Sequence, residues 1–205
     1  MIESFEALPD EKRERVIHAA LSAFGHKGFR KASIADIAAA AGVSKAMIFY
    51  WFESKHKLYE YLAMLCGSRM LGEVSGKLDD SVTDFFERIR TASETKMAML
   101  RQTPALLAFF KNIYLEPDPE AGEVIDRIKA MSEGVFGGLF VGGVDTSKFK
   151  DGVDAELIFR FAIWASEGFV SELGEVTVGD VDSFIGEFYR CMDMLKQHLY
   201  KEEYL

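Results

Sequence analysis

Apolar residues recur at helical spacing along nearly the whole chain, and no other feature restricts the fold as strongly. No segment shows the convincing alternation of apolar and polar residues that a half-buried strand requires. We therefore predict an all-α fold of about nine helices, with three short N-terminal helices and a larger helical part behind them. The predicted helices cover residues 10–28, 34–41, 45–51, 54–77, 82–103, 105–114, 124–136, 155–173 and 180–200.

Proline and glycine residues mark the expected breaks between these helices. Pro117 and Pro119 interrupt the helical pattern, and the glycine-rich stretch 134–152 is expected to be the loosest connection in the chain. The three N-terminal helices end near residue 53. We therefore predict a first domain over residues 1–53 and a second, helical domain over residues 54–205.

Residues 33–51 have the spacing of a helix-turn-helix. Two short helical segments flank the turn Gly42-Val43-Ser44. Gly42 can adopt the left-handed conformation of a tight turn, and Val43 can fill the space between the helices. Ser33 and Ser44 are predicted N-caps. The N-terminus of the second helix is then free to enter the major groove of DNA, where base edges can be distinguished.

The net charge of −9 argues against DNA binding until the charges are divided along the chain. Residues 1–60 hold nine Lys or Arg against eight Asp or Glu, whereas the rest holds fifteen against twenty-five. The acidic part would repel DNA and leave the N-terminal part as the docking end.

Other function classes find no support in the sequence. The longest uncharged apolar run, residues 134–144, is shorter than the ~20 residues of a membrane span, and the N-terminus lacks the pattern of a signal peptide. We therefore expect a cytoplasmic protein. Cys66 and Cys191 lie far apart, the histidines have no metal-ligand spacing, and the glycine pairs follow no strand. We expect no metal, no cofactor and no catalytic residue, so an enzyme is not predicted.

The N-terminal 60 residues resemble the tetracycline-repressor (TetR) family of transcriptional regulators. The resemblance is specific because several motif elements agree in order and spacing. The shared positions are Ala20, Phe24, Gly28, Phe29, residues 33–38, residues 42–45, residues 48–52, Ser54, Lys55 and Leu58. The remainder of the chain resembles the family only in length and in its succession of helices.

The resemblance implies that residues 45–51 form the helix that reads DNA. Its leading residues would meet base edges or phosphates, with Lys45 reaching a phosphate or a guanine and Met47 a thymine methyl group. Phe49 stands where the family commonly has a tyrosine that contacts phosphate, and the indole of Trp51 is a candidate replacement, whereas Tyr50 and Phe52 are expected in the core. The predicted DNA-contacting residues are Ser33, Ser44, Lys45, Ala46, Met47, Phe49, Trp51 and Lys55.

For the larger domain the resemblance implies an effector pocket and a dimer interface. Taken singly, each pocket candidate is better interpreted as ordinary core, and only together do they favour an apolar cavity. The candidates are Phe109, Phe110, Tyr114, Phe136, Phe140, Phe161 and Trp164. The dimer candidates lie on the last two helices: Phe169, Phe184, Phe188, Met192 and Leu195.

These features predict a homodimeric, ligand-responsive repressor on a palindromic DNA operator. The effector is expected to be small and apolar, either neutral or cationic, because the larger domain is acidic. The alternative is a DNA-bound adaptor that responds to a protein partner instead of a small molecule. A general DNA-organising protein would be expected to be more basic.

Overall fold

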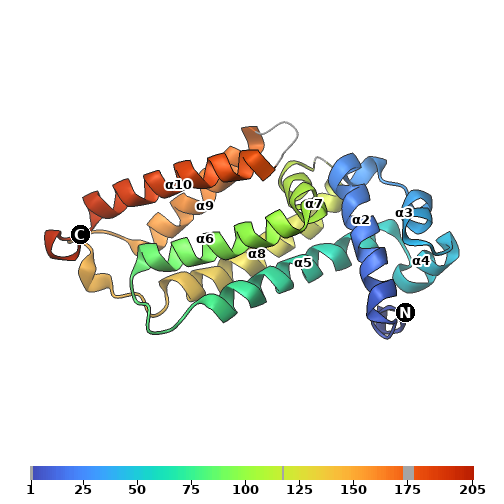
Figure 1. The fold of residues 1–205 in the computed structure, drawn as a ribbon, viewed down its shortest axis with the longest axis horizontal. Helices are drawn as coiled ribbons and strands as arrows, with labels where there is room; N and C mark the ends of the chain where they lie inside the picture. Colours follow the sequence, from blue (N-terminus) through green and yellow to red (C-terminus); the bar gives the residue numbers. More distant parts are fainter. Residues whose placement is uncertain (1, 117, 173–177) are drawn as a thin grey trace. The chain divides into compact units, whose positions relative to one another are not determined.

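The computed structural model describes residues 2–116, 118–172 and 178–205, and the regular elements in these ranges are helices (Figure 1). Only an isolated antiparallel bridge, Phe149 to Tyr200, departs from this pattern in the described part. The all-α prediction is confirmed. The helices are α1 (Ile2–Glu6), α2 (Asp10–Lys31), α3 (Ile34–Ala41), α4 (Lys45–Phe52), α5 (Lys55–Lys77), α6 (Phe85–Gln102), α7 (Pro104–Leu115), α8 (Pro119–Val141), α9 (Ala155–Glu172) and α10 (Val178–Leu199), with 3-10 turns at Thr146–Lys148 and Glu202–Tyr204.

Three elements differ from the sequence-based expectation. Helix α2, predicted to end at Gly28, continues to Lys31. Helix α8 continues through the glycines of the stretch predicted to be loose and ends only at Val141. Phe140, in its last turn, is 2% exposed, and burial of such side chains offsets the low helix propensity of glycine. The short helix α1 was not expected either. Its Phe5 is fully buried, with ring centroids 5.3 Å from Trp51 and 4.8 Å from Phe52.

The chain divides into two compact units. Unit 1 comprises Met1–Ser68 and Thr103–Lys129, and unit 2 comprises Arg69–Gln102 and Ala130–Leu205. Helices α5 and α8 each begin in unit 1 and end in unit 2. Unit 1 is larger than the predicted domain of residues 1–53 because α7 packs along α2, the start of α5 packs on α2, and the start of α8 contacts α5. The functional boundary after residue 53 stays a prediction.

The core of unit 1 is built around aromatic rings that α2, α5 and α7 contribute. Tyr59 of α5 is fully buried, with centroids 5.1 Å from Phe24, 5.1 Å from Phe29 and 5.5 Å from Phe109. Its hydroxyl has no hydrogen-bond partner among the described residues, and burial raises the pKa of this phenol. Helices α2, α5 and α7 therefore pack on one another through these rings.

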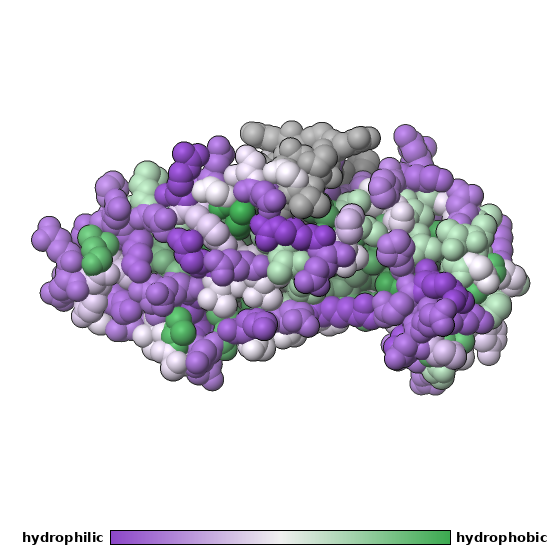
Figure 2. All heavy atoms as spheres, in the orientation of Figure 1, coloured by the Kyte–Doolittle hydropathy of each residue, from purple (hydrophilic) through white to green (hydrophobic). Residues whose placement is uncertain are grey.

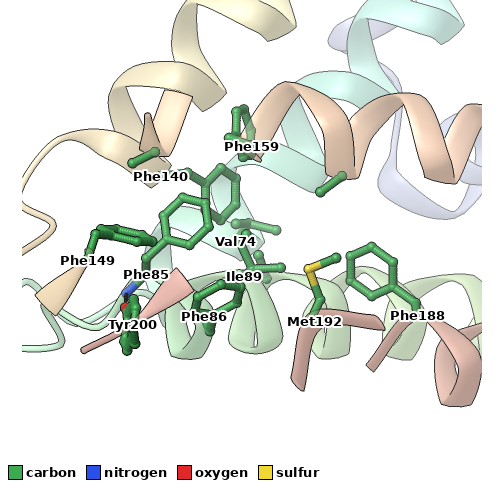
Figure 3. Packing of buried hydrophobic residues seen from close by; sticks show 13 residues of the cluster. Val74, Phe85, Phe86, Ile89, Phe140, Phe149, Phe159, Phe188, Met192 and Tyr200 are labelled. Atoms are coloured by element: carbon green, nitrogen blue, oxygen red, sulfur yellow. Dashed lines mark hydrogen bonds between the residues drawn. The ribbon is translucent and has the colours of Figure 1, made fainter. Parts of the chain in front are cut away.

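The core of unit 2 gathers aromatic side chains from α6, α8, α9 and the C-terminus (Figure 3). Phe140 stacks on Phe159 with a centroid distance of 4.9 Å. At the other end of the cluster, Tyr200 packs edge-on against Phe149 at 4.8 Å and against Phe86 at 5.2 Å. These contacts join the last residues of the chain to the start of α6.

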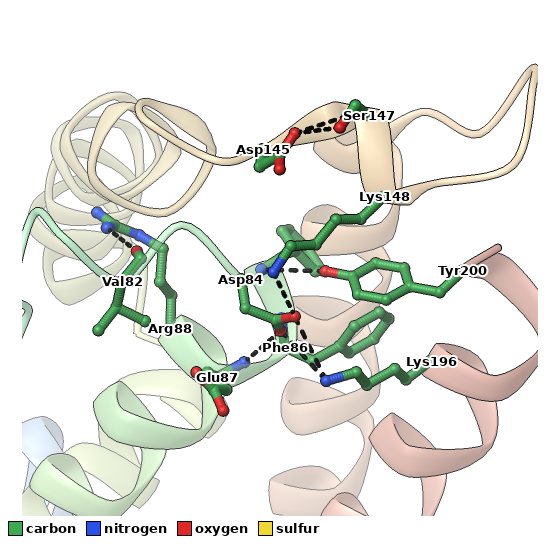
Figure 4. A network of polar contacts seen from close by, with 11 residues as sticks. Val82, Asp84, Phe86, Glu87, Arg88, Asp145, Ser147, Lys148, Lys196 and Tyr200 are labelled. Atoms are coloured by element: carbon green, nitrogen blue, oxygen red, sulfur yellow. Dashed lines mark hydrogen bonds and ion pairs between the residues drawn. The ribbon is translucent and has the colours of Figure 1, made fainter. Parts of the chain in front are cut away.

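A polar network around Asp84 closes this end of unit 2 (Figure 4). The Asp84 carboxylate caps α6 by accepting from the backbone N–H groups of Phe86 and Glu87, both at 3.1 Å. It also pairs with Lys148 at 3.1 Å and Lys196 at 3.4 Å. Partial burial, the largest single influence, would raise the pKa of Asp84, but the Glu87 N–H and the two ammonium groups together lower it. The ionised carboxylate thus stabilises the fold.

Hydrophilic residues cover most of the face of the molecule shown in Figure 2. Among the described residues, no single helix has the length and apolar character to cross a membrane. The bent pair α3 and α4 passes the same test of length and composition only when its two helices are combined.

Candidate nucleic-acid interface

Helices α3 and α4 form a helix-turn-helix. They are bent by 108° relative to each other across the turn of Gly42, Val43 and Ser44, which is the angle range of this motif. Gly42 has the left-handed backbone that the sequence predicts, with φ 67° and ψ 36°. The N–H of Val43 donates to the carbonyl of Ala38 at 3.0 Å, which closes the C-terminus of α3 and directs the chain into α4.

Serine side chains begin both helices of the motif. The Ser33 hydroxyl oxygen accepts from the N–H of Asp36 at 3.4 Å, and that of Ser44 accepts from the N–H of Met47 at 3.2 Å. The predicted capping roles are confirmed. Each hydroxyl keeps its own hydrogen for a further acceptor, so contact of Ser33 or Ser44 with a phosphate oxygen stays a prediction.

The first turn of α4 presents the side chains that the sequence assigns to base reading. Lys45 and Ala46 are exposed, and Met47 is half-buried. The Lys45 ammonium lies 5.6 Å from the ring centroid of Phe49, which is itself 40% exposed. The helix thus presents one cation and two apolar side chains at its leading edge.

The last turns of α4 reverse the expected roles of Tyr50 and Trp51. Trp51 is 3% exposed and packs on Phe5, so its indole offers no surface to DNA, whereas Tyr50 is 62% exposed. The helical spacing of the buried residues Ile48, Trp51 and Phe52 turns Tyr50 outward. Tyr50 is therefore the residue that sequence reasoning missed, because residues 48–52 are all apolar or aromatic and carry no local signal of which side chain faces outward.

Lys55, a predicted phosphate contact, is already engaged within unit 1. Its ammonium donates to the carbonyl of Arg30 at 3.2 Å and lies 4.6 Å from the ring centroid of Phe29. These contacts tie the start of α5 to the last turn of α2. A phosphate contact would have to share or replace them.

Ion pairs occupy some of the described basic residues of unit 1 and leave others unpaired. Lys27 pairs with Asp36 at 2.8 Å, and Lys57 pairs with Glu53 at 2.8 Å. Among the described residues, Arg30, Lys31 and Lys45 take part in no ion pair. Their charges are thus free to attract a polyanion.

The aromatic residues predicted for an effector pocket do not gather in one place. Phe109 is fully buried in the core of unit 1, with Phe110 half-buried beside it, and Phe140 is buried in the core of unit 2. Phe161 and Trp164 are 51% and 55% exposed. The side chains of Tyr114, Phe136 and Phe169 lie outside the described part of the structure. A groove of about 740 Å³ runs along α2 and α3, and none of the predicted pocket residues lines it.

The predicted dimer residues of α10 mostly face the chain's own core. Phe188 and Met192 are 8% and 4% exposed, and Phe184 and Leu195 pack against the same cluster as partly buried side chains. Two of these side chains thus have almost no surface to offer a second copy. The exposed apolar residues of α9, at positions 157, 161 and 164, lie instead along one face at helical spacing.

Comparison with known proteins places the helix-turn-helix in a family. The family model described as bacterial regulatory proteins, tetR family, matches residues 16–62, which contain the whole motif. Among curated proteins, the transcriptional activator FasR of Mycolicibacterium smegmatis is 28% identical over 128 residues. That match covers 62% of this chain and only 58% of FasR.

Two further relatives match over most of their length. The transcriptional repressor KstR2 of Rhodococcus jostii is 26% identical over 184 residues, covering 83% of this chain and 85% of that protein. The solved structure of the fatty acid degradation regulator FadR from Bacillus halodurans has a TM-score of 0.71 at 17% identity, covering 87% of this chain and 96% of that one. At this identity the structural likeness shows the fold alone.

Proposed function

The chain is a DNA-binding transcriptional regulator of the tetR family, and from this premise we propose that it is a homodimeric repressor that a small effector releases from a palindromic operator. The observation that carries the proposal is the outward face of α4. Lys45, Ala46 and Met47 stand at its first turn, and Tyr50 is exposed one turn later. Such a face fits base edges and the adjacent phosphates of one half-site.

We propose that two copies associate through α9. Leu157, Phe161 and Trp164 are 49%, 51% and 55% exposed, and their spacing places them on one face of the helix. A second copy is the occupant that a chain of this family requires, because two recognition helices related by a two-fold axis read an inverted repeat. Met194 of α10 is a further exposed apolar side chain of unit 2, at 53% exposure.

The effector is proposed to be a small lipid-like compound that enters unit 2. FadR from Bacillus halodurans is named as a regulator of fatty acid degradation, and KstR2 of Mycobacterium tuberculosis, another structure with the same fold, is named as a ketosteroid transcriptional regulator. In this chain, Lys96 of α6 is partly buried beside the aromatic core of unit 2. Its ammonium lies 6.0 Å from the ring centroid of Phe140, and desolvation lowers its pKa to about 8. Because its N–H groups can donate to a carboxylate or carbonyl oxygen, we favour a neutral or acidic effector over a cationic one.

Selection of bound fragments from a random pool of DNA tests the function directly. The full chain should enrich an inverted repeat, and a pool without symmetric enrichment would refute the dimer on DNA. Fluorescence titrations with fatty acids, steroids and lipophilic cations, with and without operator, then test the effector. A true inducer must bind more weakly in the presence of operator, by the factor by which it weakens operator binding. If no compound behaves in this way, the protein-responsive adaptor becomes the better account.

Trp164→Glu tests the dimer surface, with Leu205→Glu as its control. Leu205 is also an exposed apolar side chain of unit 2, 62% exposed, but it lies at the C-terminus and not on α9. Sedimentation should show a monomer for Trp164→Glu and a dimer for Leu205→Glu, with operator binding lost only in the first. A dimeric Trp164→Glu variant would exclude α9 as the interface.

A further inference from the structure

Helix α2 contains a backbone break at Gly28. This residue has φ 71° and ψ 170°, although the chain is helical on both sides of it. In an uninterrupted helix the N–H of Phe29 would donate to the carbonyl of Gly25, four residues earlier. The extended ψ of Gly28 turns the Phe29 N–H away from that carbonyl. One donor and one acceptor of α2 therefore need partners from elsewhere.

Helix α7 supplies both partners. The carboxylate of Glu116, at the C-cap of α7, accepts from the Phe29 N–H at 2.5 Å. The side-chain amide of Asn112, one turn earlier, donates to the Gly25 carbonyl. Glu116 thus supplies the acceptor, and Asn112 the donor, that the interrupted helical hydrogen bond lacks. Since a buried N–H or C=O without a partner is costly, the seating of α7 and the conformation of this turn depend on each other.

The glycines allow this close approach. A Cβ atom on Gly25 would lie 2.8 Å from the Cβ of Ala108, and a Cβ on Gly28 would lie 3.0 Å from the Glu116 carboxylate. Side chains at these two positions would separate α7 from the α2 backbone. The close contact between α7 and the backbone of α2 is therefore restricted to the turn that contains these two glycines.

The last turn of α2 determines where the helix-turn-helix begins. Only Ala32 and Ser33 separate the end of α2 from the start of α3, and Ser33 is the N-cap of α3. The ion pair of Lys27 with Asp36, 2.8 Å, joins the same turn to α3. A change in this turn therefore changes the direction from which α3 and α4 leave α2.

We propose that Asn112 and Glu116 are positioning residues for DNA binding, which hold the helix-turn-helix in its operator-binding orientation through the backbone of α2. A displacement of α7 that breaks the two hydrogen bonds releases the last turn of α2 and lowers operator affinity. The proposal rests on the proposed function, because it needs an operator whose two half-sites demand a defined orientation.

The test compares Glu116→Ala, Glu116→Gln and Asn112→Ala in the full chain, with Glu123→Ala as the matched control. Glu123 is an exposed carboxylate of the same unit with no hydrogen bond to α2. Glu116→Ala removes the acceptor of the Phe29 N–H, and Asn112→Ala removes the donor to the Gly25 carbonyl. Each variant should weaken operator binding equally, roughly tenfold or more. Glu116→Gln keeps an oxygen acceptor and should restore most of the affinity, whereas Glu123→Ala should bind like the wild type.

Two readouts separate positioning from general stability. Affinity for random-sequence DNA should change much less than operator affinity, because non-specific binding depends mainly on charge. Amide hydrogen exchange should show that the Phe29 N–H loses protection in Glu116→Ala but not in Glu116→Gln, with the amides of unit 2 unchanged.

Two results would overturn the proposal. One is wild-type operator affinity in Glu116→Ala and Asn112→Ala, and the other is unchanged protection of Phe29 in Glu116→Ala. If Glu116→Ala does not fold, Asn112→Ala alone decides. A wild-type chain that selects no DNA would refute the proposed function instead, and the exchange of Phe29 would still report on the hydrogen bond itself.

Discussion

Gly25→Ala isolates the contact between α2 and α7 more sharply than any change of a polar side chain. Gly25 is buried within the helical part of α2, where alanine is intrinsically preferred over glycine by roughly 0.5–1 kcal/mol. The new methyl group, however, would lie 2.8 Å from both the Cβ of Ala108 and the backbone N of Phe109. Carbon atoms prefer about 3.5–4.0 Å, so α7 must withdraw by roughly 1 Å.

The two effects have opposite signs, and their sizes decide the outcome. Overpacking of this kind costs about 1–3 kcal/mol. Withdrawal of α7 also weakens the hydrogen bond from Asn112 to the Gly25 carbonyl, which adds about 0.5–1.5 kcal/mol. After the gain in helix propensity, the free energy of unfolding should fall by about 0.5–4 kcal/mol. The corresponding fall in Tm is about 2–4 °C for each kcal/mol in a chain of this size.

Thermal unfolding followed by circular dichroism measures this effect, and Gly72→Ala is the matched control. Gly72 lies within α5, and a Cβ placed there meets no atom within 4 Å. The control should therefore gain roughly 0.5–1 kcal/mol from helix propensity alone. Operator affinity should fall in Gly25→Ala and stay unchanged in Gly72→Ala. If Gly25→Ala is stabilised as much as Gly72→Ala, the close packing of α7 on α2 is wrong.

Three further predictions concern single side chains. The pKa of Asp84 is lower in the folded chain than its unfolded value of about 3.9, so the ionised carboxylate stabilises the fold above that value and loses this effect as the pH falls through the folded pKa. The difference in Tm between Asp84→Asn and the wild type should therefore shrink towards pH 3. Tyr50→Phe should weaken operator binding about tenfold because it loses a phosphate hydrogen bond, whereas Phe49→Tyr should strengthen operator binding. Equal operator affinities for the wild type and both variants in an anisotropy titration would contradict both predictions. Lys55→Met should lower the Tm but leave the salt dependence of DNA binding unchanged, whereas a log–log slope smaller by about 0.9 for each lost contact would show that Lys55 binds phosphate after all.

Much of the helix-turn-helix could be predicted from the sequence because its signals are local. The bounds of α3, its serine cap and its glycine C-cap agree with the structure residue by residue. A cap bonds an N–H two or three residues away, and a left-handed turn depends on one glycine. Such interactions span a few residues and are readable in one window of sequence.

The tertiary structure alone decided which side of a helix is buried where apolar residues surround it. In α4, residues 48–52 are all apolar or aromatic, and only the packing of Trp51 against Phe5 turns Tyr50 outward. In α9 and α10, Trp164 is exposed whereas Phe188 and Met192 are buried. These residues are equally apolar in the sequence. Apolar character predicts that they are buried, but it does not show whether the same chain or a second copy covers them.

The sequence by itself determined the class of fold, the helix-turn-helix and its position in the first 60 residues, because periodicity and caps act along the chain. The tertiary structure decided how that motif is held. The interrupted bond between Gly25 and Phe29 is completed by Asn112 and Glu116, 87 residues further along in each case. A backbone group that needs a partner does not reveal in its own sequence which distant side chain will provide it, since that depends on where the folded chain brings α7.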